Sequence, residues 1–334
     1  MILCHVLGVA RTWLFLHDDV VLTEAQEESI ADAVEKRLSG LPVAYITGVK
    51  EFYGRNFSVT PNVLIPKPDT ELLVEKAVAY AKSKIAFSDA RDSGAGASFE
   101  ARRQFRFADI CTGSGCIAVS VLAELFAEFG EHCGLAESSG QCGTDALGKA
   151  DAFARVLADA TDISAAALSV ARKNAETLLG DAALRSLRFF EGDLCAPLMA
   201  GGSIAQVCGG APDSEPIPKY DMVLSNPPYV PADVTDELLK DGRGEPRLAL
   251  DGDTDSAIGG AVCATDGNSG DGLAIIRRLI PQVKEILLPG GVFFMETGEY
   301  NAEKASEYLS KCGFTDIVIH RDLAGQLRLV ESHI

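Results

Sequence analysis

Short apolar runs and amphipathic segments alternate along the chain from Phe107 onward. The apolar runs predict strands over residues 106–110, 154–162, 187–193, 220–226 and 291–297. Apolar positions at the helical period predict helices between them, over residues 115–129, 164–178, 271–288 and 301–311. This alternation favours an α/β fold with a parallel sheet and helices on both faces. The runs 315–320 and 326–332 have no helix between them, which predicts an antiparallel hairpin at or near the sheet edge.

The beginning of the chain has a different pattern. Residues 23–39 predict a helix that begins with a capping box between Thr23 and Gln26. Its apolar positions repeat at the helical period, at Ile30, Val34 and Leu38. The first 19 residues lack the basic start and cleavage site of a signal peptide, and Arg11 interrupts their apolar run. We therefore expect an amphipathic helix or its remnant there.

Residues 44–71 are rich in β-formers and turn residues. Three prolines forbid a continuous helix through this stretch: Pro61, Pro66 and Pro68. A helix is predicted over 70–82, and the polar, Ser/Gly/Ala-rich residues 83–105 predict a linker or variable loop.

Three further stretches break the strand–helix rhythm, at about 130–152, 200–218 and 252–271. They are rich in Gly, Ser, Ala and Asp, so we expect solvated surface insertions. The last is rich in Asp, but its spacing does not match a calcium-binding loop, and we expect no metal site.

Composition excludes several classes of protein. The 334 residues are 47% hydrophobic, which is ample for a buried core, and the length suggests about two domains. A net charge of −18 disfavours a protein whose main task is gripping nucleic acid phosphates. No apolar run reaches the ~18 residues of a membrane helix. The 9 cysteines are scattered without a CxxC pair, which predicts reduced thiols in the cytoplasm, with neither a disulfide framework nor a zinc site.

A glycine turn, Asp109 to Ala118, lies between the strand 106–110 and the next helix. Its Gly113 and Gly115 permit a tight turn and a close backbone approach to a ligand, and the spacing fits a GxGxxA nucleotide-binding fingerprint. The fingerprint alone is weak, because a plain strand–helix turn uses the same residues.

Two acidic residues follow later strands. Asp162 can accept both hydroxyls of a ribose, or it can begin the next helix as an N-cap, and the residues leave both readings open. Asp193 can hold an adenine amino group with Leu194 against the ring, or it can simply be a turn residue.

The sequence SNPPYV at 225–230 follows the strand 220–226, at the end where open α/β sheets bind ligands. Pro227 and Pro228 lock the backbone and remove two donors. The remaining acceptors are the Asn226 side-chain oxygen and the Pro227 carbonyl, and the ring of Tyr229 follows. Two acceptors and a flat ring fit a planar –NH2 group, although a Pro-Pro turn without function is the alternative.

The glycine turn, Asp162, the pair Asp193–Leu194 and the SNPPYV motif occur in this order along the chain. This arrangement resembles class I S-adenosylmethionine-dependent methyltransferases that act on planar amino nitrogens. Residues 45–75 and 245–252 resemble the HemK/PrmC family, the peptide chain release factor N5-glutamine methyltransferases. The resemblance runs from about Cys4 to the C-terminus without the three insertions. It implies a Rossmann-like, mainly parallel seven-stranded sheet with a C-terminal antiparallel hairpin, preceded by a short, truncated helical domain. The implied domains are a helical substrate-docking part at 1–44, a β-rich connecting segment at 45–68 and the methyltransferase domain at 69–334.

The resemblance also implies which residues form the site. Asn226, Pro227 and Tyr229 would be catalytic, and with Pro228 they would hold the target glutamine. Phe57, from the connecting segment, would form part of the glutamine pocket. S-adenosylmethionine, leaving as S-adenosylhomocysteine, would contact Cys111, Thr112, Gly113, Ser114, Gly115, Asp162, Asp193, Leu194 and Asn226. No metal is implied.

The implied substrate is the glutamine of the Gly-Gly-Gln motif in class-1 peptide chain release factors. We expect a cytoplasmic monomer without direct contact to nucleic acid or membrane. Cys111 stands where the family usually has Gly, which puts cofactor affinity in question, and Lys67 replaces the usual Arg.

Three rival functions remain from the residues. The first is an amino-methyltransferase acting on adenine or guanine of DNA or rRNA, which the acidic charge and the 45–75 segment disfavour. The second is a nicotinamide oxidoreductase, in which the NPPY sequence has no role. The third is a degenerate fold kept as a binding module.

Overall fold

The computed structural model describes residues 1–93, 104–131, 155–200, 217–240, 244–254 and 270–334. The insertions expected at 130–152, 200–218 and 252–271 lie almost wholly outside these residues, as do positions 94–103 of the expected linker.

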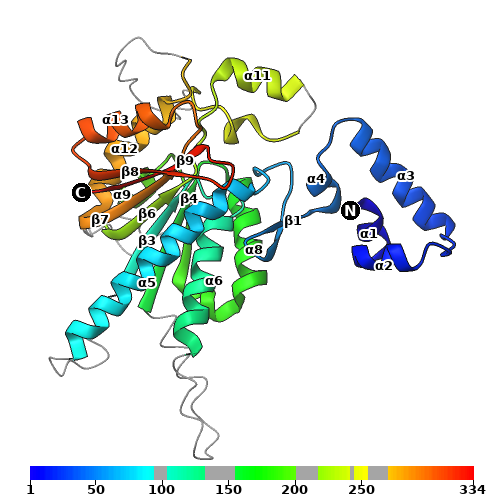
Figure 1. The fold of residues 1–334 in the computed structure, drawn as a ribbon, viewed down its shortest axis with the longest axis horizontal. Coiled ribbons are helices and arrows are strands. Elements are labelled where there is room, and N and C mark those ends of the chain that lie inside the picture. The colour runs from blue at the N-terminus through cyan, green and yellow to red at the C-terminus, as the bar shows by residue number, and fades with distance from the viewer. Residues whose placement is uncertain (94–103, 132–154, 201–216, 241–243, 255–269) are drawn as a thin grey trace, which may run out of the picture.

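Seven strands form one sheet in the order β5-β4-β3-β6-β7-β9-β8 (Figure 1). Their bounds are β3 Phe105–Ile110, β4 Val156–Asp162, β5 Leu187–Glu191, β6 Tyr220–Ser225, β7 Leu287–Glu296, β8 Thr315–Arg321 and β9 Leu327–His333. Strands β3 to β7 run parallel, and β9 pairs antiparallel with both β7 and β8. The predicted mainly parallel sheet with a C-terminal hairpin at its edge is confirmed.

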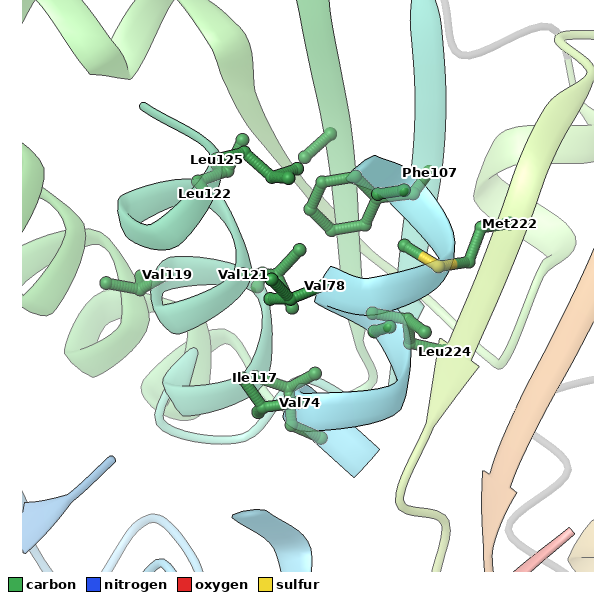
Figure 2. Close-up of a cluster of buried hydrophobic side chains, with 14 of the residues drawn as sticks. Val74, Val78, Phe107, Ile117, Val119, Val121, Leu122, Leu125, Met222 and Leu224 are labelled. Atoms are coloured by element: carbon green, nitrogen blue, oxygen red, sulfur yellow. The ribbon is translucent and has the colours of Figure 1, made fainter. Parts of the chain in front are cut away.

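Helices cover both faces of the sheet. One face carries α5 Glu71–Ser93, α6 Cys116–Glu131 and α8 Ala165–Ala183. The other carries α9 Ala196–Met199, α12 Ala274–Ile286 and α13 Ala302–Lys311. The central strands are apolar on both sides for this reason: Phe107 belongs to the core under α5 and α6, whereas its neighbour Ala108 belongs to the core under α12. Figure 2 shows the first of these cores, with Val78 of α5 and Leu122 of α6 near Phe107.

Helix α5 is longer than the sequence predicted. It continues to Ser93 instead of ending near residue 82, so the linker prediction is wrong for residues 83–93. Ala81 and Ile85 extend the buried face of the helix, and the Lys82 ammonium pairs with Glu128 of α6 at 2.8 Å. The overall composition of residues 83–93 is polar, so their few apolar positions did not predict a helix.

Four helices precede the sheet, with the bounds α1 Ile2–Leu7, α2 Arg11–Leu16, α3 Glu24–Leu38 and α4 Val43–Thr47. Figure 1 shows α1, α2 and α3 grouped to one side of the sheet. The predicted capping box at Thr23 is confirmed. The first 19 residues form two short helices instead of one, because Gly8 adopts a left-handed φ of 66° and ends α1.

The predicted apolar face of α3 does not enter a core. Ala33 is the buried residue of this helix, whereas Val34 and Leu38 are 42% and 82% exposed. The periodicity identified the helix correctly, but it did not identify what covers the helix.

The stretch predicted to be β-rich from residue 44 begins instead with the helix α4, which Pro42 precedes and Gly48 ends at φ 70°. An antiparallel hairpin of β1 Val49–Phe52 and β2 Arg55–Ser58 follows. The remaining described elements are η1 Pro68–Thr70, η3 Leu184–Ser186, η4 Arg247–Ala249 and α11 Ala232–Lys240. Within the described part of the chain, no helix has the length and apolar character to cross a membrane.

The hairpin is fastened to the sheet domain through Asn174 of α8. The Asn174 side chain accepts from the Ser58 amide at 2.7 Å and donates to the Ser58 carbonyl at 3.0 Å. It also donates to the carbonyl of Ser114 at 2.9 Å, within the glycine turn. One buried side chain therefore fixes the connecting segment relative to the turn after β3.

Candidate active site

The chain runs from β3 to β4 and β5 on one side of the sheet and then returns to β6 on the other side. The carboxyl ends of β3 and β6 therefore form a topological switch point, where open α/β sheets bind ligands. A cavity of about 240 Å³ lies there, and residues that follow β3, β4, β5 and β6 line it. The four motifs identified in the sequence thus meet at one place.

The glycine turn follows β3 and opens α6. Gly115 has a φ of 78°, and a Cβ atom there would lie 3.1 Å from the Cβ of Ala171 in α8. Gly113 has a φ of 55°, with open space where its side chain would be. Glycine is therefore required at residue 115 for close packing and at residue 113 for backbone conformation.

The buried carboxyl of Asp109 holds this turn together. Its Oδ2 accepts from the Thr112 hydroxyl at 2.6 Å and from the Ala118 amide at 3.2 Å. Burial raises the pKa of Asp109 to about 7, against the opposing effect of these hydrogen bonds.

Cys111 begins the turn with a φ of 63°, a left-handed conformation that costs residues other than glycine energy. Its side chain borders the cavity, and burial raises the pKa of its thiol. The departure from the family pattern at this position thus introduces backbone strain beside the ligand site.

Asp162 lines the cavity at the end of β4. Its carboxylate accepts from the Gly113 amide at 2.8 Å and from the Ser164 amide at 2.9 Å. Ser164 itself caps α8, because its hydroxyl accepts from the Ala167 amide at 3.2 Å. Asp162 therefore stabilises the glycine turn and is not simply the N-cap of α8. Its carboxylate keeps lone pairs that can accept hydrogen bonds from ligand hydroxyls.

Asp193 and Leu194 line the cavity after β5. The guanidinium of Arg278 in α12 forms an ion pair with Asp193. The Leu194 carbonyl accepts from the Thr161 hydroxyl at 2.9 Å, which holds this loop against β4.

Asn226 and Pro228 also line the cavity, at the end of β6. The Asn226 amide nitrogen donates to the hydroxyl of Thr70 over 3.2 Å. Thr70 is the last residue of η1, just before α5, so two parts of the chain that lie far apart in sequence meet here. Sequence reasoning did not single out Thr70, because nothing local to it indicates this contact.

Tyr229 does not border the cavity among the described lining residues, and neither does Pro227. The Tyr229 hydroxyl donates to Glu296 Oε1 at 3.1 Å, and its carbonyl accepts from Asn301 at 3.1 Å. The Tyr229 ring is held in the packed layer under α12.

Phe57 lies elsewhere than the sequence suggested. It is fully buried in the core and packs edge-on against Phe52, with ring centroids 6.0 Å apart. Because alternate side chains of β2 point to opposite faces, its ring faces the core and not the cavity. Its contribution is to support the hairpin, and direct contact with a substrate does not fit this position.

Residue Glu296 was also missed, although it stands at the end of a predicted strand. Its carboxyl is 2% exposed, and burial raises its pKa. Hydrogen bonds from Thr70 and Tyr229 and the positive charge of Arg328 act in the opposite direction.

Two further segments border the cavity, one within residues 61–67 and the other within 246–249. The Lys67 ammonium contacts Glu245 at 2.7 Å, and the Ile65 amide donates to the same carboxyl at 3.3 Å. No group of His, Cys, Asp and Glu side chains suited to a metal ion occurs among the residues that the structure describes.

Residues 1–48 match the family model described as the PrmC N-terminal domain. Over its length the chain is 35% identical to a release factor glutamine methyltransferase of Bordetella pertussis, covering 99% of this chain and 92% of the relative. The chain belongs to the release factor glutamine methyltransferase family. A second member, from Burkholderia pseudomallei, is 34% identical, with 97% of this chain and 87% of the relative covered. Among solved structures, a methyltransferase from Pyrococcus furiosus covers 93% of this chain and 98% of its own, at 13% identity and a TM-score of 0.42.

Proposed function

We propose that this chain transfers the methyl group of S-adenosylmethionine to the side-chain N5 of glutamine in the Gly-Gly-Gln motif of class-1 peptide chain release factors. The observation that carries the proposal is the position of Asn226, which borders the cavity with its amide nitrogen bound to Thr70. Among the described residues no partner is assigned to the Asn226 oxygen, which can accept a hydrogen bond from a ligand. An –NH2 group is the matching donor.

The cavity suits S-adenosylmethionine. Two carboxylates of the protein border this cavity, Asp162 and Asp193. They follow β4 and β5, at the end of the sheet where α/β folds bind nucleosides. Cys111, Thr112, Gly113 and Ser114 provide the backbone of the wall between them, and Leu194 provides an apolar surface. Gly115 lies behind this wall and lets α6 approach α8. We assign these residues to cofactor binding, with S-adenosylhomocysteine as the product.

The chemistry asked of the protein is mainly positioning. The bound cofactor supplies an electrophilic methyl group on a positively charged sulfur. The glutamine nitrogen is a weak nucleophile because its lone pair is delocalised into the carbonyl. Acceptors at Asn226 and the Pro227 carbonyl would orient the –NH2 hydrogens and aim the lone pair at the methyl group. Such orientation is worth up to ~7–11 kcal/mol in favourable intramolecular cases.

The same acceptors complement the positive charge that develops on nitrogen during transfer. No strong base is needed in this scheme, since the N-methylated cation is acidic and loses its proton to water. Pro228 would shape the wall beside the amide. Tyr229 would act by fixing the loop through its contacts with Glu296 and Asn301.

We assign residues 1–44 to release factor docking, 45–68 to the connection and 69–334 to methyl transfer. The match of residues 1–48 to the PrmC N-terminal domain supports the first assignment. We place the enzyme in the cytoplasm as a monomer, in keeping with the site of translation termination.

The experiment incubates the purified chain with S-adenosylmethionine and a class-1 release factor, followed by mass spectrometry of the Gly-Gly-Gln peptide. One added methyl group on the glutamine is expected, and Asn226→Ala should abolish it with the fold intact by circular dichroism. Parallel reactions contain DNA and rRNA in place of the release factor. Methyl transfer to a base but not to glutamine would overturn the proposal.

A further inference from the structure

Asn301 occupies the N-cap position of α13, where asparagine is a favoured residue because its side-chain oxygen can accept from the first helix amides. In this chain the side chain makes no capping bond. Its amide nitrogen instead donates to the carbonyl of Tyr229 at 3.1 Å. Asn301 is 1% exposed, and its side-chain oxygen is buried without a hydrogen-bond partner among the described residues. The residue therefore does not serve the helix that it precedes, and its contact with Tyr229 calls for another explanation.

The orientation of the Asn301 amide follows from chemistry. A carbonyl oxygen only accepts hydrogen bonds, so the –NH2 end of the amide must face Tyr229. The Tyr300 hydroxyl donates to the same carbonyl at 3.3 Å. Two consecutive residues of the connection between β7 and α13 are thus directed at one backbone atom of the NPPY sequence.

Two glycines pack closely against the backbone of Tyr229. A Cβ atom at Gly252 would lie 2.7 Å from the Tyr229 Cα, and one at Gly272 would collide with the Tyr229 carbonyl oxygen. Gly272 also has a φ of 74°, so both conformation and packing favour glycine there. The Tyr229 carbonyl therefore has little room to move while the Asn301 contact holds.

The loop that contains Pro227 and Pro228 is fixed at both ends. At the end of β6, the Ser225 hydroxyl donates to the Ile110 carbonyl at 2.8 Å. Between the ends, the two proline rings lock φ at successive residues. Because few torsions remain, the direction of the Pro227 carbonyl is set by the strand end on one side and by the Tyr229 peptide on the other.

We propose that Asn301 is a positioning residue, which holds the Tyr229 carbonyl and thereby directs the Pro227 carbonyl toward the –NH2 group of the substrate. This inference rests on the proposed function and adds to it the residue that fixes the second acceptor of the substrate grip. Neither Asn301 nor Tyr300 borders the cavity among the described lining residues, so their effect passes through the loop.

Other contacts hold the chain after Tyr229. The Val230 amide donates to the Leu250 carbonyl, and the Gly252 amide donates to the Val230 carbonyl, both at 2.9 Å. Loss of the Asn301 contact should therefore release the Tyr229 peptide without detaching the segment that follows it. A change in catalysis can thus be measured in a folded protein.

The test replaces Asn301 with aspartate and measures methyl transfer to the release factor. Aspartate has the same shape, but its ionised carboxylate only accepts hydrogen bonds and would face the Tyr229 carbonyl oxygen. At about pH 9, where a carboxyl is ionised, we expect kcat of N301D to be about tenfold to a hundredfold below wild type, because a small displacement of a reacting group costs this much. The KM for the release factor and the cofactor affinity, measured by calorimetry, should stay within about twofold, since Asn301 touches neither ligand.

The pH dependence distinguishes this role from helix capping. A protonated carboxyl can donate to the Tyr229 carbonyl, and burial raises the pKa of a carboxyl at residue 301. The ratio of the N301D kcat to the wild-type kcat should therefore rise as the pH is lowered toward about 6. An ionised carboxylate is the better group at a helix N-terminus, so a capping role predicts the opposite trend.

The ratio is used because other charged groups lie around this contact. The segments that meet there carry Glu296 of β7, Asp253, Asp271 paired with Arg277, Glu303 of α13 and Arg328 of β9. All of these groups are present in both wild type and N301D. Their own titration therefore affects both kcat values, and the ratio isolates the introduced carboxyl.

Tyr300→Phe tests the same carbonyl without a change in the buried residues. Tyr300 is 57% exposed, and phenylalanine removes its hydroxyl alone. We expect kcat to fall about twofold to fivefold with unchanged cofactor affinity, as for the loss of one neutral hydrogen bond. If N301D does not fold, this variant decides, and an unchanged kcat overturns the inference.

The outcomes separate the two proposals. An inactive wild-type enzyme overturns the proposed function and this inference with it. With an active wild-type enzyme, a kcat ratio for N301D that is constant or rises with pH overturns the inference alone. So does a kcat that falls only in parallel with cofactor affinity and thermal stability, because that pattern indicates a purely structural role.

Discussion

The Lys67 ammonium, which borders the cavity, lies 2.7 Å from the carboxylate of Glu245. The two residues stand in the two stretches that most specifically resembled the release factor methyltransferases in sequence. Their contact shows that these stretches form one physical unit that borders the ligand site. Lys67, which replaces the usual arginine, still supplies the cation that the buried Glu245 requires.

Removing that cation should loosen the cavity wall. In Lys67→Ala, the 7% exposed Glu245 side chain keeps the Ile65 amide but loses its charged partner. Because Lys67 is partly exposed, we expect the free energy of unfolding to fall by only about 1 kcal/mol. Cofactor affinity should fall a few-fold as the segment moves. Lys67→Arg is the matched control and should retain the wild-type stability in urea unfolding and the wild-type cofactor affinity in calorimetry. Equal losses in the two variants would contradict a role of the Lys67 charge in holding Glu245.

Relief of backbone strain at Cys111 should be measurable. The left-handed φ of 63° costs a residue with a Cβ atom about 1–2 kcal/mol, which glycine avoids. Glycine also has more freedom to lose in the unfolded chain, which offsets part of this gain. We therefore expect Cys111→Gly to exceed Cys111→Ala in stability by about 1 kcal/mol, since both variants lack the thiol. Urea unfolding of C111G and C111A measures this difference in the free energy of unfolding. A more stable alanine variant would show that the backbone strain at residue 111 is absent in solution.

The two turn glycines should differ in their tolerance of alanine. A Cβ at Gly115 meets the Cβ of Ala171 at 3.1 Å, whereas a Cβ at Gly113 meets no atom within 4 Å. Gly113→Ala therefore adds backbone strain alone, and Gly115→Ala adds strain and forces α6 away from α8. We expect G115A to lose more stability, by ~1–3 kcal/mol beyond the loss in G113A. Thermal unfolding of both variants tests the order, and the reverse order would be inconsistent with this packing.

Stability should depend on pH through Asp109. Burial raises its pKa from 3.8 to about 7, so between these values the folded chain binds more protons at this site than the unfolded chain. Its contribution to the free energy of unfolding is thus full below 3.8 and is lost as the pH rises through about 7. Asp109→Asn removes this titration and keeps an acceptor for Thr112. Urea unfolding at several pH values gives the free energy of unfolding of wild type and variant. The wild-type value should fall relative to that of the variant between pH 3.8 and about 7 and change little above this range. A constant difference would refute the assignment.

Local patterns predicted the sheet well because its strands are buried on both faces. The runs around Phe107 and Met222 are apolar whichever way their side chains point, and the helices between them keep a regular period. The strand–helix alternation also predicted a mainly parallel sheet, whereas the order of its strands came from the structure. The glycine turn, Asp162, Asp193 and Asn226 could be placed at the strand ends for the same reason.

What local patterns could not supply were contacts between distant segments. Thr70 and Asn226 lie 156 residues apart, and no periodicity links them. The sequence places the Tyr229 ring against a bound –NH2 group, yet its hydroxyl donates to Glu296, which lies 67 residues away in the chain. Phe57 follows the strand pattern of its hairpin, but which face of that hairpin meets the core depends on α8.

The position of β9 has a consequence for how the enzyme is made. This strand is the last of the seven to be synthesised, yet it lies between β7 and β8 inside the sheet, and its Arg328 contacts Asp69 beside Thr70. A chain that lacks β9 has an open sheet edge at β7 and lacks the ion pair between Arg328 and Asp69. We therefore expect methyl transfer to require β9 in its place between β7 and β8.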